Sequence, residues 1–212
     1  MSRLSAENLL EATIYTLILK GRFLRYRDEF EEALVQLSVA RGLLDELAGS
    51  AGTSRDQALA VLFADEIGPE IRHCAHEMGR EKAYDVDGIV KELATKYRED
   101  TVEGCGMLVE QLEVEADAAE KVQGRKKLET LMWEGGPVPV RNPELVDVLL
   151  KVQEAEARLE DQQKGDPKDN KSVKDSRSKK GVAAYDATLL SLSDAEEVAR
   201  KLAEAHQVGF SP

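Results

Sequence analysis

The sequence is poor in several kinds of residue, and each shortage argues against a class of protein. Its 212 residues include only two cysteines, too few for a disulfide framework, so we expect a protein of a reducing compartment. The longest unbroken apolar run, residues 58–64, is far shorter than the roughly 20 residues that cross a bilayer. The N-terminus has no apolar signal-peptide segment. We therefore expect no direct insertion into a membrane.

An excess of basic residues is also lacking. With 29 Lys and Arg against 41 Asp and Glu, the formal net charge is −12 at pH 7. Proteins that bind nucleic acid by themselves usually carry a basic face, because phosphate neutralisation supplies much of the affinity. The charge argues against nucleic-acid binding by the chain alone, but a local basic patch on one element is compatible with it.

Enzyme motifs are missing as well. There is no Walker loop, no Gly-x-Gly-x-x-Gly after a strand and no Gly-x-Ser-x-Gly elbow. The carboxylates are spread along expected helix faces, where solvated surface is the usual explanation. We therefore expect no enzyme activity and no cofactor.

The stretch 66–79, "EIGPEIRHCAHEMG", holds the residues with the most chemical character. On a helix, Glu70 and His73 would share a face, which resembles half of a di-iron carboxylate site, but the second Glu-x-x-His helix is absent. A zinc site would need a partner cluster of Cys or His that the sequence lacks. Activation of the Cys74 thiol by His73 is disfavoured, since adjacent helical residues diverge. We expect no metal, and we expect Cys74 and Ala75 to pack inward with the histidines nearer the surface.

Helix-forming residues are what the sequence has in abundance. Ala, Leu, Glu, Lys and Arg dominate, and apolar residues recur at helical spacing. Asn142 and Pro143 form a good helix start, Ser193 and Glu196 form a capping box, and Pro69 fits the first turn of a new helix or a kink. The pattern predicts helices over residues 5–26, 28–49, 55–68, 88–97, 107–133, 142–161 and 191–206.

The first two expected helices have the register of a tetratricopeptide repeat. In that repeat, small residues occupy the positions where paired helices approach closely. Gly21, Ala33 and Ala40 fall at these positions. Leu24 and Leu37 take the places of the usual aromatic residues. We expect an all-α fold, a tetratricopeptide-like array of seven or eight helices, and an ordinary antiparallel helix pair remains the alternative.

Two segments interrupt the helical pattern. Residues 133–143, "WEGGPVPVRNP", favour an extended, turn-like excursion. Residues 162–181 contain no large apolar side chain except Val173, so burial cannot offset the entropy cost of ordering them. We expect three regions: a tetratricopeptide-like helical domain (1–161), a flexible linker or loop (162–181) and a C-terminal helix that packs on or extends the domain (182–212).

One basic cluster falls on an expected helix, in "KGRFLRYR", residues 20–27. Its cations could contact phosphates, and Tyr26 could stack on a base. A solvated helix end with cations near its C-terminus explains the cluster at least as well. Weaker candidates are the basic segments 124–127 and 171–180. The candidate RNA-binding residues are Lys20, Arg22, Arg25 and Arg27.

Three stretches resemble the 68 kDa subunit family of the signal recognition particle. They are "EFEEALVQLSVARGLLDEL" (29–47), "IGPEIRHCAHEMG" (67–79) and "MWEGGPVPVRNPELVDVLLKVQEAE" (132–156), in the family's order. The resemblance covers most of the chain and weakens over 162–181. The middle stretch is the most specific because its matching residues occur together: Pro69, Ile71, Arg72, Cys74, Ala75 and Gly79.

The resemblance implies a non-catalytic scaffold: an RNA-binding domain that helps to shape the particle's RNA in cotranslational protein targeting to the endoplasmic reticulum. The implied partners are signal recognition particle RNA, the 72 kDa subunit and, indirectly, the ribosome. The implied location is the cytoplasm, with a nucleolar stage during assembly and contact with the endoplasmic reticulum surface through the particle. The family's arginine-rich segment would lie upstream and its partner-binding region downstream, so we expect an internal fragment. The competing hypothesis is a tetratricopeptide-type protein–protein interaction module without RNA binding.

Overall fold

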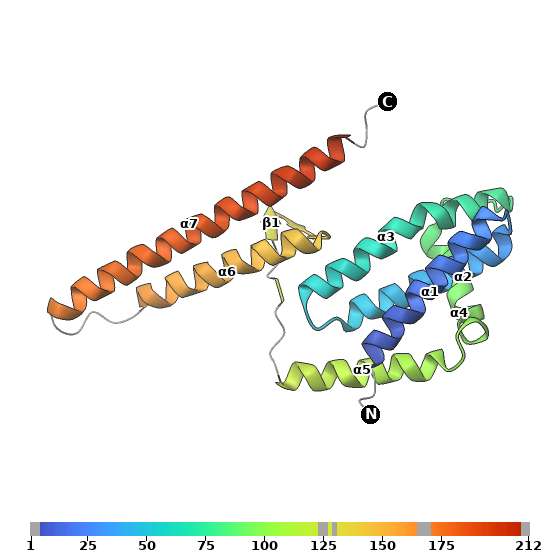
Figure 1. Cartoon of the computed structure of the whole chain (residues 1–212), viewed down its shortest axis with the longest axis horizontal. Helices are drawn as coiled ribbons and strands as arrows, with labels where there is room; N and C mark the ends of the chain where they lie inside the picture. Colours follow the sequence, from blue (N-terminus) through green and yellow to red (C-terminus); the bar gives the residue numbers. More distant parts are fainter. Residues whose placement is uncertain (1–4, 123–126, 129–130, 165–170, 209–212) are drawn as a thin grey trace. The chain divides into compact units, whose positions relative to one another are not determined.

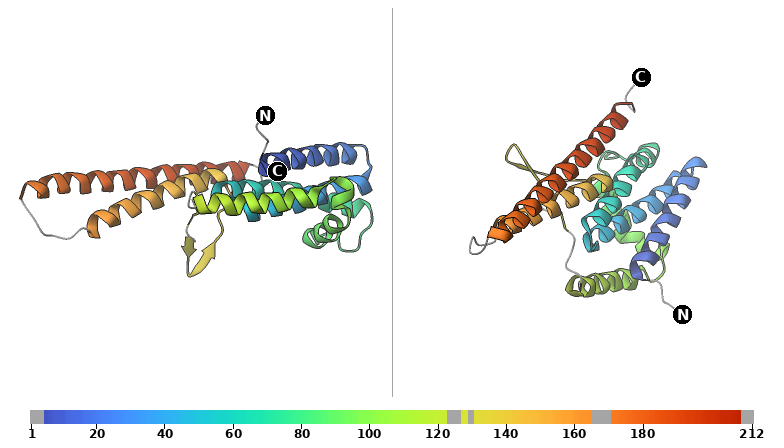
Figure 2. Two further views of the ribbon diagram at one scale, coloured as in Figure 1. Left: turned by 90° about the horizontal axis from the view of Figure 1, so that it is seen from below. Right: turned by 60° about the vertical axis from the view of Figure 1, so that its left-hand side comes forward.

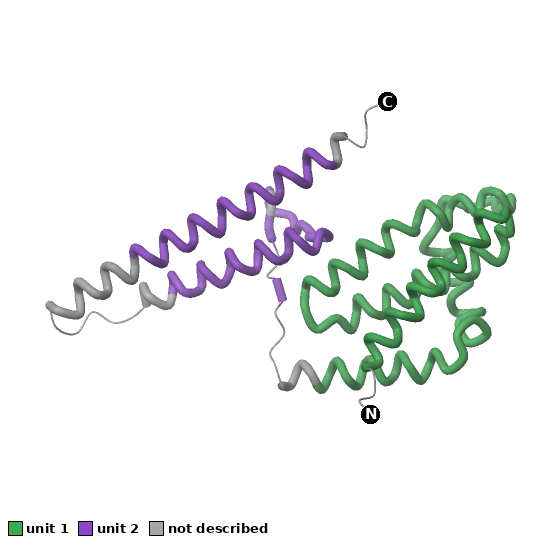
Figure 3. Tube along the Cα trace, in the orientation of Figure 1, with its two compact units in different colours: residues 1–125 green, residues 126–212 purple. Residues whose placement is uncertain are grey.

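The computed structural model describes residues 5–122, 127–128, 131–164 and 171–208, with the backbone alone at 119–122, 133, 161–164, 171–181 and 206–208. These residues form seven helices and one two-stranded sheet, so the predicted all-α class is confirmed (Figure 1). Residue contacts divide the chain into two compact units, Met1–Arg125 and Lys126–Pro212 (Figure 3). No helix of the described residues is long and apolar enough to cross a membrane.

Unit 1 is built around one central helix. Helix α2 packs against α1, α3, α4 and α5, and Figure 2 shows α1, α2 and α3 running side by side. The short turns between these helices produce antiparallel neighbours. The helices of this unit are α1 (Ala6–Tyr26), α2 (Phe30–Ser50), α3 (Ser54–Glu77), α4 (Val86–Thr101) and α5 (Cys105–Val122).

The core of unit 1 lies mainly where α1, α2 and α3 meet. Burial of a Leu or Ile side chain contributes about 1.5–3 kcal/mol, so the apolar stripes of the sequence drive these helices together. The N–H of Ala6 donates to Oε2 of Glu115 at 2.9 Å, which joins the start of α1 to α5. The largest completely buried side chains include Leu10, Leu34, Leu37, Leu43, Ile67 and Ile71.

The close approach predicted between the first two helices is present. A Cβ atom placed on Gly21 would lie 2.7 Å from Cγ of Leu37, a distance that a real Cβ does not tolerate. Ala33, Leu37 and Ala40 are completely buried. Glycine at position 21 therefore lets α1 pack directly on the Leu37 side chain of α2.

Helix α3 differs from the expectation at Pro69. Of the two expectations there, a new helix is wrong: a single helix runs from Ser54 to Glu77 with Pro69 in its interior, the position at which the other expectation, a kink, would fall. Proline lacks the N–H that an interior position normally donates. Buried Ile67 and Ile71 hold α3 in the core on either side of Pro69, and this packing outweighs the local preference.

Unit 2 contains a hairpin and a pair of helices. The strands β1 (Leu131–Trp133) and β2 (Gly136–Val138) pair antiparallel. Strand β2 lies in the segment that was expected to be extended. The turn residues Glu134 and Gly135 have φ values of 48° and 83°, the positive values of a type I′ hairpin turn. Helices α6 (Pro143–Lys164) and α7 (Lys171–Val208) pack together through Val148, Val152 and Ala195.

The helices of unit 2 differ in extent from the expected ones. Asn142 caps α6 as predicted: its Oδ1 accepts from the N–H of Leu145 at 3.1 Å. Ser193 lies inside α7 rather than at a helix start, so no helix begins at the capping-box sequence. The backbone of 171–181, expected to be part of a linker, is helical; extending a helix costs less than starting one, and Lys and Arg favour helix.

The division into units also differs from the expected regions. Contacts separate the chain between Arg125 and Lys126, whereas the sequence placed residues 1–161 in one domain. Helix α5 ends at Val122 instead of reaching residue 133, and the hairpin then leads into α6. Helix α6 packs on α7, which makes the C-terminal helix a partner of α6.

Candidate nucleic-acid interface

The four basic candidates lie on the last two turns of α1 and at its C-terminal cap, Arg27. The Arg22 and Arg25 side chains are 39% and 38% exposed, and that of Arg27 is 58% exposed. Lys20 is exposed. The helix therefore presents all four cations at one end, but it places them in two different environments.

Arg22 and Arg25 are bound to carboxylates of α3. Nε of Arg22 donates to Oε1 of Glu70 at 2.8 Å, and the guanidinium also donates to Oε1 of Glu66 at 3.3 Å. The Arg25 guanidinium lies 3.4 Å from Oε2 of Glu70, whose side chain is only 13% exposed. Burial by itself would lower the pKa of Arg22, but the hydrogen bonds and charges of Glu70 and Glu66 outweigh burial and raise it. These two arginines hold α1 against α3.

Lys20 and Arg27 face solvent at the end of α1 that also carries two exposed aromatic residues. Lys20 forms no ion pair within the described part of the chain. Arg27 pairs with Glu29 at 2.9 Å and lies 5.6 Å from the ring centroid of Phe23. Tyr26 is 90% exposed and Phe23 58%. We call this group the α1 tip patch; its members are Lys20, Phe23, Tyr26 and Arg27.

The α1 tip patch has the chemistry that contacts single-stranded nucleic acid. Positions 20, 23 and 27 follow i, i+3, i+7 spacing and share one side of the helix, with Tyr26 beside them. Lysine and arginine neutralise phosphates, and an exposed ring offers a stacking surface to any base. The patch can therefore meet both parts of a nucleotide.

The side chains of the stretch 66–79 are placed as predicted, with Cys74 and Ala75 inward and the histidines nearer the surface. Cys74 and Ala75 are completely buried. The His73 ring meets Phe30 edge-on, with centroids 5.7 Å apart, and His76 keeps an 80% exposed side chain. Glu70 serves the two arginines. The side chains of the stretch 66–79 thus contribute to packing and to ion pairs.

Neither cysteine has the surroundings of a reactive thiol. Cys74 and Cys105 are free and completely buried. Burial raises the pKa of both thiols, which lowers the fraction of nucleophilic thiolate. Within the described residues, no group of three His, Cys, Asp or Glu side chains could hold a metal ion.

Glu66 and Glu70 were missed as partners of the arginines. They lie 44 and 48 positions from Arg22 in sequence. The spacing of the two carboxylates on one helix face was the only local signal, and it does not predict which basic residues they contact. Among the weaker candidates, Lys127 is exposed, whereas residues 124–126 and the side chains of 171–180 lie outside the described part.

Comparison with known proteins gives one assignment. No solved structure matches the chain. The sequence matches the family described as RNA-binding signal recognition particle 68 over residues 1–209, nearly its whole length. The chain belongs to the RNA-binding signal recognition particle 68 family.

Proposed function

We propose that the chain is a non-catalytic scaffold of the signal recognition particle that binds and shapes the particle's RNA in cotranslational targeting to the endoplasmic reticulum. Membership of an RNA-binding family supports this role. The observation that carries it is the α1 tip patch, in which Arg27 lies against the exposed Phe23 ring and exposed Lys20 and Tyr26 lie on the same end of α1.

The charge of the chain restricts where RNA can bind. At a net charge of −12, much of the surface repels phosphate. Lys20 is a cation without a carboxylate partner in the described part, and Arg27 keeps an exposed guanidinium beside Phe23. We place the phosphate contact at the end of α1 because these two cations lie together there beside exposed rings of the same helix.

Arg22 and Arg25 act in this proposal by fixing the end of α1. Their ion pairs with Glu66 and Glu70 tie the last two turns of α1 to α3. A fixed helix end presents Lys20 and Arg27 in one geometry, which lowers the entropy cost of binding.

The proposal extends to the fold type and the other partners. Gly21 in contact with Leu37, with Ala33 and Ala40 buried nearby, supports a tetratricopeptide-like helix pair. Family membership supports the 72 kDa subunit as a partner and the ribosome as an indirect one. It also supports a cytoplasmic particle that passes through the nucleolus during assembly and acts at the endoplasmic reticulum surface.

A filter-binding titration with signal recognition particle RNA, at about 50 and about 200 mM salt, tests the role. Lys20→Gln and Arg27→Gln should each weaken binding about three- to tenfold and reduce the slope of log affinity against log salt by about 1. Tyr26→Ala should weaken binding with little change in slope, because stacking is not ionic.

Lys91→Gln is the matched control, since it removes an exposed lysine of α4. Its affinity and salt slope should stay those of the unchanged protein. Absence of binding at low salt, or binding without a salt slope, would refute an RNA role for this chain. Equal losses in Lys91→Gln and Lys20→Gln would refute the α1 tip patch as the contact.

A further inference from the structure

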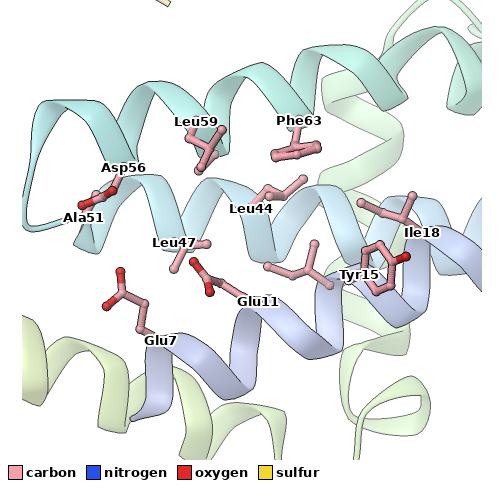
Figure 4. A pocket seen from close by; sticks show the side chains of 12 residues that line it. Glu7, Glu11, Tyr15, Ile18, Leu44, Leu47, Ala51, Asp56, Leu59 and Phe63 are labelled. Carbon is pink, nitrogen blue, oxygen red and sulfur yellow. The ribbon is translucent and has the colours of Figure 1, made fainter. Parts of the chain in front are cut away.

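Unit 1 contains a groove where α1, α2 and α3 come together (Figure 4). Leu44 and Leu47 of α2 form its floor. Tyr15 and Ile18 of α1 line one side. Leu59, Ala60 and Phe63 of α3 line the other. In Figure 4 the labelled Leu47, Leu59 and Phe63 side chains point toward the space between the three helices.

The groove exposes apolar surface that unit 1 does not cover. Tyr15 is 65% exposed, Phe63 44% and Leu59 36%. The cavity volume is about 180 Å³, and an apolar cavity of about 150 Å³ is large enough for a benzene molecule. The groove thus has room for one apolar side chain of about that size.

Three carboxylates line one end of the groove. Glu7 and Glu11 come from α1, and Asp56 comes from the first turn of α3 (Figure 4). Asp56 is engaged by the Thr53 hydroxyl. Within the described part of the chain, neither Glu7 nor Glu11 forms an ion pair. Burial and the charges of Glu11, Asp56 and Glu115 raise the pKa of Glu7. Among the described residues, no Lys or Arg side chain is paired with Glu7 or Glu11.

These features select one kind of occupant. RNA is excluded because its phosphates would meet the carboxylates. A neutral apolar molecule would fill the cavity but leave the acidic end unpaired. A peptide segment with an apolar side chain flanked by Lys or Arg suits both the apolar cavity and the acidic end. Burial of the apolar side chain lowers the free energy of the complex, and so does pairing of the Lys or Arg with the carboxylates.

We propose that the groove between α1 and α3 binds a basic amphipathic helix of a partner protein, with one apolar side chain over Leu44 and Leu47 and its cations on Glu7 and Glu11. Placing an amphipathic helix in an apolar groove is a common mode of peptide recognition. The role is separate from RNA binding, which the proposal assigns to the opposite end of α1. Loss of one activity therefore does not imply loss of the other.

A peptide titration with the 212-residue chain tests the proposal. The probe is a synthetic fluorescent peptide with Leu and Phe at positions i, i+3, i+4 and i+7 and Lys or Arg elsewhere. Its counterpart carries Glu in place of every Lys and Arg. Fluorescence anisotropy should show binding of the basic peptide that weakens with salt, and at least tenfold weaker binding of the acidic one.

Two pairs of variants locate the contact. Tyr15→Ala and Glu11→Gln change the groove, and each should lower the affinity for the basic peptide about three- to tenfold. Leu19→Ala and Glu32→Gln are the matched controls: Leu19 is an exposed residue of α1 outside the groove, and Glu32 is an exposed carboxylate of α2 outside it. The controls should bind as the unchanged protein does.

Several outcomes would overturn the proposal. They are equal binding of the acidic and basic peptides, an unchanged affinity in both groove variants, and equal losses in the controls. A concentration-dependent dimer in analytical ultracentrifugation that Tyr15→Ala abolishes would assign the groove to a second copy. Loss of RNA affinity in Tyr15→Ala, with peptide binding intact, would assign the groove to RNA.

Discussion

Nε of Arg22 donates to Oε1 of Glu70 at 2.8 Å, joining α1 to α3 across 48 positions of sequence. The same carboxylate faces Arg25 through its other oxygen at 3.4 Å. Two of the four candidate RNA ligands are thus part of the contact between helices. They position the helix end from which Lys20 and Arg27 extend.

Removal of the Glu70 charge should destabilise unit 1 more than removal of the Glu66 charge. Glu70→Gln leaves Arg22 and Arg25 without their least exposed partner, and we expect a loss of about 1–3 kcal/mol in the free energy of unfolding. The Glu66 side chain is 57% exposed, so Glu66→Gln should cost less than about 1 kcal/mol. Urea unfolding followed by circular dichroism measures both, and equal costs would contradict the structural role of Glu70.

Gly21→Ala should be destabilising although alanine favours helix. The added Cβ would lie 2.7 Å from Cγ of completely buried Leu37, so we expect a cost of about 1–3 kcal/mol. Gly49 in α2 has no atom within 4 Å of the same added position. Gly49→Ala should therefore stabilise the protein, by about 0.4–1 kcal/mol. The midpoints of thermal unfolding of the two variants measure both changes in stability. Stabilisation by Gly21→Ala would refute the close approach of α1 and α2.

The pH dependence of stability should change on substitution of Glu7. Burial raises its pKa above the ordinary 4.5, and so do the facing carboxylates Glu11, Asp56 and Glu115. A raised pKa in the folded state means that ionised Glu7 opposes folding. This cost is complete above the folded-state pKa and disappears as the pH falls below the unfolded value.

Glu7→Gln should therefore raise the midpoint of thermal unfolding near neutral pH. The difference from the unchanged protein should shrink as the pH falls through the raised pKa and vanish below 4.5. Glu32→Gln, at an exposed position on α2, is the control and should show no such trend. A pH-independent difference for Glu7→Gln would contradict the electrostatic cause.

The two thiols should resist modification in the folded protein. Cys74 and Cys105 are completely buried, and burial raises the pKa of both. Near neutral pH little thiolate forms and reagents have no access to it. Mass spectrometry after brief treatment with iodoacetamide should find both thiols unmodified without denaturant and both modified in guanidinium. Rapid modification of Cys74 in the native state would contradict its place in the core.

Local sequence rules succeeded where one segment holds all the information. The stripe in residues 5–26 predicts α1, and the pair Asn142–Pro143 predicts the start of α6. Those rules wrongly allowed a new helix at Pro69, which lies inside α3 because neighbouring Ile67 and Ile71 are anchored in the core. They also failed at 171–181, where the backbone continues into α7.

The sequence by itself determined the helical class, most helix positions, the small residue at position 21 and the family motifs, because side-chain spacing and backbone propensity act within a few residues. Only the tertiary structure decided that Glu70 pairs with two of the four basic candidates and that Glu7 and Glu11 lie at the end of an apolar groove. Ion-pair energies and cavity shapes depend on distance and burial in space, which the packing of α1, α2 and α3 sets.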